Sequence, residues 1–195
     1  MSERVVDMIT FSLRDTKNAK VFVEAKTAIH TFIRTLESFE FSVSRLNALV
    51  LSFFRRFAQL LRERFAADFQ QAIREAQHQP MIVNDATELA KVLSVCWLKP
   101  GEAEQLGKQP FPLSLPFSQT YPLCCMDIRS LVEQYYSFSQ GMTQYHQEID
   151  AILSQSLDDL LIQLISVNIR DTVEQSNNLS QIAQIIVNIE HFQLA

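Results

Sequence analysis

The sequence predicts an all-α protein: an elongated bundle of about six helices with one long proline-rich connector. Only 3 of the 195 residues are glycine, far below the usual ~7%. Few positions can therefore adopt the positive φ that tight turns and glycine-rich loops require. Apolar residues make up 47% of the chain and recur at helical spacing over long stretches. Four of the 6 prolines fall within residues 109–125, which marks that segment as non-helical.

Residues 1–96 are expected to form an N-terminal helical group. A short helix is predicted at 3–13 and a second at about 18–38, where apolar residues recur at helical spacing. Residues 38–42 then form a turn. Ser42 or Ser44 can begin the next helix, because a serine oxygen accepts hydrogen bonds from free backbone N–H groups.

One long helix is predicted for 43–79, where no Gly or Pro interrupts the pattern. At ~1.5 Å per residue it would extend about 55 Å, longer than a compact domain of this size, and so we expect an elongated bundle. Pro80 ends it, because the residue before proline avoids helical dihedrals. Since Arg64 falls on the heptad seam, a globular bundle is favoured over a simple two-stranded coiled coil.

Residues 81–83 are expected to be extended or irregular, and a short helix follows at 86–96. Asn84 and Asp85 precede it, and Glu88 stands where a capping box would place it. Residues 97–121 are then expected to be an extended connector that lies on the bundle without sheet or helix partners. In it, apolar residues alternate with Pro and Ser from Phe111 to Phe117.

Residues 122–195 are expected to form a C-terminal helical group that packs with the first as one elongated bundle. Helices are predicted from Pro122, from Thr143 to about Gln175, and from Leu179 onward, with a break at Gly141. The last helix is still in full periodicity at Ala195, so we expect the chain to be part of a longer protein. The core is expected to include Phe53, Phe57, Leu60, Ile149, Leu153, Leu160, Leu164 and Ile185.

No catalytic, metal-binding or cofactor-binding group is expected. The four histidines are scattered, and Cys124–Cys125 has no second pair with which to bind zinc. Asp158 and Asp159 point about 100° apart on a helix and cannot act together. We interpret these cysteines, with Cys96, as packing residues, with a redox or metal role for Cys124 and Cys125 as the alternative. An active site assembled from distant residues remains the enzymatic alternative.

The overall composition limits the classes of partner and the cellular compartment that fit this chain. The formal net charge of −5 argues against nucleic acid, because phosphate binding needs a basic surface. Residues 1–15 do not resemble a secretory leader, and no window of about 18 uncharged apolar residues exists to span a membrane. Three cysteines imply no disulfide framework, which favours a reducing compartment.

Basic residues are concentrated on the long helix, between Arg45 and Arg74. The central members of this cluster are Arg55, Arg56, Arg62 and Arg64. Acidic residues are interleaved with them, so one interpretation is a solvated helix face paired to neighbouring acids. The other is a surface for an acidic partner or for anionic lipid headgroups.

The order of local motifs resembles the middle of the Sec-fifteen subunit of the exocyst, also called exocyst complex component six. The resemblance covers roughly 20–195. Its most specific pieces are the proline segment that ends in FSQTYP and the helix pair EIDAILSQSLDDLL and LSQIAQIIVNIEH.

The resemblance implies a fragment of a helical rod in a tethering complex, without catalysis or cofactor. The exocyst holds secretory vesicles at the plasma membrane before fusion in exocytosis. This family contacts other exocyst subunits and acts as a Rab effector, with the main GTPase contact outside this fragment. A cytoplasmic protein recruited to vesicles and to sites of exocytosis is therefore expected, with peripheral membrane association through the complex. No GTPase-contacting residue is assigned here.

Overall fold

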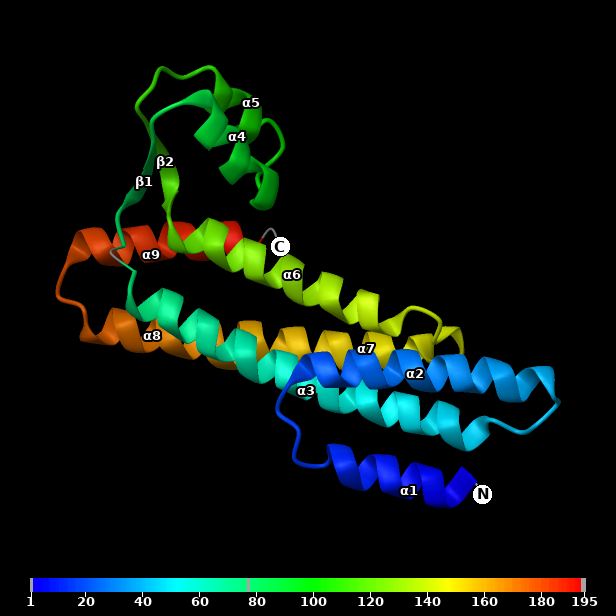
Figure 1. Cartoon of the computed structure of the whole chain (residues 1–195). Helices are drawn as coiled ribbons and strands as arrows, with labels where there is room; N and C mark the ends of the chain where they lie inside the picture. Colours follow the sequence, from blue (N-terminus) through cyan, green and yellow to red (C-terminus); the bar gives the residue numbers. More distant parts are fainter. Residues whose placement is uncertain (1, 77, 194–195) are drawn as a thin grey trace. The chain divides into compact units, whose positions relative to one another are not determined.

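A computed structural model describes residues 2–76 and 78–193, apart from the side chains of residues 2, 3, 5, 163–165 and 168 (Figure 1). Helices hold 76% of the chain, and the described residues contain one two-stranded sheet. The predicted all-α class is therefore confirmed. Of the predicted core, Leu164 lies outside the described side chains.

The chain forms two compact units, each assembled from segments that are distant in sequence. The first unit combines Met1–Arg64 with Gln134–Leu157, and the second combines Phe65–Glu133 with Asp158–Ala195. The expected division was instead into contiguous groups, 1–96 and 122–195, on either side of a connector.

The first unit is all-helical. Its elements are α1 (Ser2–Leu13), α2 (Ala19–Ser38), the first part of α3 (Ser44–Arg74), the end of α6 (Thr120–Ser139), the short 3₁₀ helix η1 (Thr143–Tyr145) and α7 (His146–Asp158). Asn18 begins α2, because its side-chain oxygen accepts from the backbone N–H of Lys20 at 3.0 Å.

Aromatic rings fill the core of this first unit. Phe54 lies edge-on to Tyr135, with ring centroids 5.6 Å apart. Phe57 stacks on Phe138 at 4.6 Å. These rings join α3 to the end of α6, and the expected core residues of this unit are buried with them: Phe53, Phe57, Leu60, Ile149 and Leu153.

Gly141 permits the turn between α6 and η1, where the sequence predicted a break. Its φ is +82°, a conformation that side-chain-bearing residues seldom adopt. A Cβ built there would lie 2.7 Å from Nε2 of His30 on α2. Nearby, the Lys26 ammonium donates to the carbonyl of Gln140 at 2.7 Å. Glycine thus lets this turn approach α2 closely.

The second unit combines helices with the sheet. Its elements are the end of α3, β1 (Pro80–Val83), α4 (Ala86–Val95), α5 (Glu102–Gly107), β2 (Leu113–Ser118), most of α6, the π-helix η2 (Asp159–Ile165), α8 (Ser166–Gln175) and α9 (Leu179–Phe192). Figure 1 shows β1 and β2 leading to α4 and α5. Buried residues from these strands and helices share one core with Tyr121 and Cys125 of α6, and the expected core residues Leu160 and Ile185 are also buried.

The expectation that residues 97–121 lack sheet and helix partners is wrong. Residues 102–107 form α5, and β2 pairs with β1 in antiparallel register, with Ile82 opposite Ser114 and Val83 opposite Leu113. The alternation seen in the sequence is the two-residue period of a strand. It buries Leu113, Leu115 and Phe117 while Ser114 and Pro116 stay exposed. The partner strand is Pro80–Val83, which includes residues 81–83, expected to be extended or irregular.

Two predicted helices have different bounds. The long helix ends at Arg74, before the predicted end at residue 79. His78 has a φ of +47°, which a right-handed helix cannot include, so the chain turns before it reaches Pro80. The helix predicted for 143–175 begins as η1 and contains η2, a π-helical stretch in which backbone bonds span five residues.

Candidate functional site

The structure places the arginines of α3 in different surroundings. Arg55 and Arg62, seven residues apart on one helix face, line a groove of about 390 Å³ in the first unit. The other residues that line it are Ala58, Gln59, Ala151, Ile152, Gln155 and Ser156. Arg56 donates to Gln59 at 2.9 Å, and Arg64 donates to Gln134 at 3.2 Å.

A buried hydroxyl chain lies beneath this groove. Tyr135 donates to Oγ of Ser156 at 2.7 Å, and Ser156 donates to the carbonyl of Ile152 at 2.8 Å. Burial raises the pKa of Tyr135, while the bond to Ser156 and the charge of Arg62 lower it less. The phenol therefore stays neutral near pH 7 and acts as a structural donor.

The change Tyr135→Phe is expected to lower the free energy of unfolding by about 1 kcal/mol, the usual net value of one buried hydrogen bond. Urea denaturation of Tyr135→Phe, Ser156→Ala and the double variant measures the coupling between the two hydroxyls. Additive effects of the two changes would contradict the hydrogen bond as the source of the loss.

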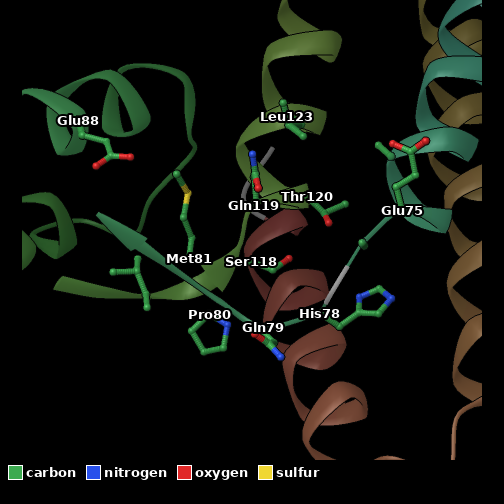
Figure 2. Close-up of a pocket in the computed structure, with 13 residues that line it drawn as sticks. Glu75, His78, Gln79, Pro80, Met81, Glu88, Ser118, Gln119, Thr120 and Leu123 are labelled. Carbon is green, nitrogen blue, oxygen red and sulfur yellow. The ribbon is translucent and has the colours of Figure 1, made fainter. Parts of the chain in front are cut away.

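A second cavity, of about 550 Å³, lies in the second unit beside β1 (Figure 2). In Figure 2 Glu75 and Glu88 lie on opposite sides of it, with Pro80 and Met81 between them. His78 also lines it. Burial lowers the pKa of His78, and its Nδ1 is buried without a hydrogen-bond partner within the described residues.

A buried polar network joins α9 to β2 and α5. Asn188 accepts from the backbone N–H of Ser118 at 3.0 Å and donates to its Oγ at 2.7 Å. Gln184 donates to the carbonyl of Pro116 at 2.9 Å. His191 lies 3.1 Å from a carboxylate oxygen of Glu102. Each amide thus has a partner, as buried polar groups require.

The cysteines belong to the core. Thiols of Cys96 and Cys125 hydrogen-bond each other, and this bond raises the pKa of Cys96 and lowers that of Cys125. Burial raises the pKa of Cys124. All three are free and buried. Across the described residues, no three His, Cys, Asp or Glu side chains gather where they could hold a metal ion.

Comparison with known proteins decides the family. The sequence model of the family described as Exocyst complex subunit Sec15 C-terminal matches residues 45–195. The chain belongs to this family. The resemblance seen in the sequence motifs is therefore confirmed.

Relatives of this Sec15-family chain are exocyst components from yeasts and mammals. It is 28% identical over 184 residues to Exocyst complex component SEC15 of Saccharomyces cerevisiae, covering 92% of the chain and 20% of that protein. It is 28% identical over 174 residues to Exocyst complex component 6 of Rattus norvegicus, covering 89% and 21%. The chain thus spans about a fifth of the length of these relatives. No solved structure matches it.

Sequence reasoning missed the polar face of this Sec15-family chain's last helix. On α9 the apolar Ile186 is 51% exposed, whereas Gln184, Asn188 and His191 are buried. These three residues recur at i, i+4 and i+7, the spacing of one helix face. That polar stripe was the available signal.

None of the helices in the described parts of the chain is both long enough and apolar enough to cross a bilayer.

Proposed function

We propose that this chain is a non-catalytic scaffold segment of an exocyst subunit. The observation that carries the proposal is the family match over residues 45–195, together with relatives named as exocyst components. The helical content is consistent with a scaffold. The segment acts by protein–protein contacts with other exocyst subunits.

The complete protein, in this proposal, helps to tether secretory vesicles to the plasma membrane before fusion. It acts in the cytoplasm and is recruited to vesicles and to sites of exocytosis. A Rab-family GTPase provides the vesicle link, and its main contact lies outside this chain. Association with the membrane is peripheral and occurs through the assembled complex.

The test is a pull-down with two baits: the complete subunit and the 195-residue chain. The complete subunit is expected to capture the other exocyst subunits and the GTP-loaded Rab protein, with the GDP-loaded form as control. The 195-residue chain is expected to capture at least one exocyst subunit but no Rab protein. Absence of exocyst subunits from both baits would overturn the proposal. GTP-dependent capture of the Rab protein by the 195-residue chain would place the GTPase contact within this chain.

A second candidate function is the binding of anionic lipid or an acidic partner by the Arg45–Arg74 helix face. It is favoured by the placement of Arg55 and Arg62 along one groove. Flotation with anionic vesicles tests it. Binding should be lost in the double variant Arg55→Glu, Arg62→Glu and kept in Arg34→Glu, a control on the exposed surface of α2. Flotation that survives in the double variant removes this candidate.

A further inference from the structure

The outer edge of β2 is closed by side chains of α9. The carbonyl of Pro116 accepts from Gln184, and the N–H of Ser118 donates to Asn188. Alternate strand residues lie about 6.6 Å apart, and helix residues four apart lie about 6 Å apart along the axis. The two amides therefore match the strand's repeat, and α9 takes the place that a third strand would occupy.

The outer edge of β1 has no corresponding partner. Facing residues of an antiparallel pair alternate between hydrogen-bonded and non-hydrogen-bonded, so either Ile82 or Val83 directs its N–H and C=O away from β2. Within the described ranges, no hydrogen bond joins residues 80–83 to an element other than β2. Ile82 is 60% exposed. Backbone groups at this edge can therefore accept a new strand.

Two carboxylates that line the cavity beside β1 favour a partner with basic side chains at this edge. Glu75 and Glu88 line it on opposite sides (Figure 2). Glu75 accepts from Gln71, and one oxygen of Glu88 accepts from Asn84, neither of which is a cation. Within the described residues, therefore, neither carboxylate has a cationic partner beside this strand edge.

We propose that the outer edge of β1 binds an extended segment of a partner protein that carries basic side chains on both flanks. Pairing by strand addition supplies main-chain hydrogen bonds, and Glu75 and Glu88 select for the basic flanks. A second copy of this chain fits poorly, because it would bring the same two carboxylates to the contact. Pro80 and the shortness of β1 also disfavour self-pairing. This proposal stands apart from the exocyst assignment, since its failure would leave co-purification with exocyst subunits unchanged.

The experiment uses the 195-residue chain and three fluorescein-labelled probes. The first probe is Lys-Thr-Val-Thr-Val-Thr-Lys, the second replaces both Lys by Glu, and the third is the Lys probe with alternate backbone nitrogens methylated. Fluorescence anisotropy is expected to show binding of the first probe only. Hydrogen exchange should slow in residues 81–83 when that probe is present. Equal binding of the methylated probe, binding of the Glu probe, or no binding of any probe would overturn the proposal.

A double variant and a matched control separate the effect of charge on probe binding from an effect on folding. Glu75→Gln with Glu88→Gln keeps the acceptor oxygens, including the one that bonds Asn84, and removes only the charges. It is expected to weaken binding of the Lys probe roughly fivefold to thirtyfold. Glu104→Gln, an exposed control on α5, should bind as the unmodified chain does. Unchanged affinity in the double variant, with an unchanged circular dichroism spectrum, would refute the role of the carboxylates.

Discussion

Replacing Phe57 by alanine is expected to lower the free energy of unfolding by about 3–5 kcal/mol. Phe57 is 4% exposed and its ring stacks on Phe138 at 4.6 Å. The change removes a large apolar group from water-free surroundings and leaves a cavity that the rigid helix α3 cannot close. Urea denaturation followed by far-ultraviolet circular dichroism measures the loss.

Phe11→Ala is the matched control for this measurement. Phe11 is 78% exposed on α1, so its removal should change the free energy of unfolding by no more than about 0.5 kcal/mol. A Phe57→Ala midpoint as high as that of the control would mean that the apolar stripe of α3 does not face the core.

Replacing Asn188 by alanine is expected to cost about 2–4 kcal/mol, because it leaves the buried N–H of Ser118 without its acceptor. The bond from Asn188 to Oγ of Ser118 is lost as well. Chemical denaturation measures the change, and hydrogen exchange should show faster exchange at residue 118. Asn177→Ala, in the exposed turn before α9, should be nearly neutral.

The variant Asn188→Leu separates the polar role of this side chain from its size. Leucine fills a similar volume and adds apolar contact, but it cannot accept from Ser118. It is therefore expected to destabilise the chain despite its greater apolarity. A Leu variant as stable as the unmodified chain would show that water or a backbone shift satisfies the N–H of Ser118.

Local features of the fold were readable from the sequence. Asp85 accepts from the N–H groups of Thr87 and Glu88, and Glu88 accepts from the N–H of Asn84, as the capping motif predicted. The position of Gly141 predicted the break after α6, because few other residues adopt its φ. Such features depend on residues within a few positions of one another, so their pattern is complete in the sequence.

Pairings between distant segments were not readable in the same way. Residues 80–83 pair with 113–118, but the sequence pattern of neither segment identifies the other as its partner. The buried role of Gln184 and Asn188 depends on backbone groups of β2, which exist as acceptor and donor only after that strand has formed. For the same reason, the contact between His191 and Glu102 could not be predicted from the sequence.

The candidate site was predicted in part. The arginines of α3 were correctly placed on a helix, but only Arg55 and Arg62 share a groove. Small residues of two helices, Ala58 of α3 and Ala151 of α7, line that groove. The cavity beside β1 could not be anticipated, since residues 81–83 were expected to be extended or irregular without a paired strand, and residues 97–121 to have no sheet partner.

Trp97 makes the second unit optically distinct. It is the chain's single tryptophan, it belongs to the unit formed by Phe65–Glu133 and Asp158–Ala195, and the Arg129 guanidinium lies 4.4 Å from its ring centre. Intrinsic indole emission therefore reports on that unit without any label, whereas circular dichroism averages over both. Superimposable emission and dichroism curves would show that the two units unfold as one cooperative system, and separated curves would assign a stability to each.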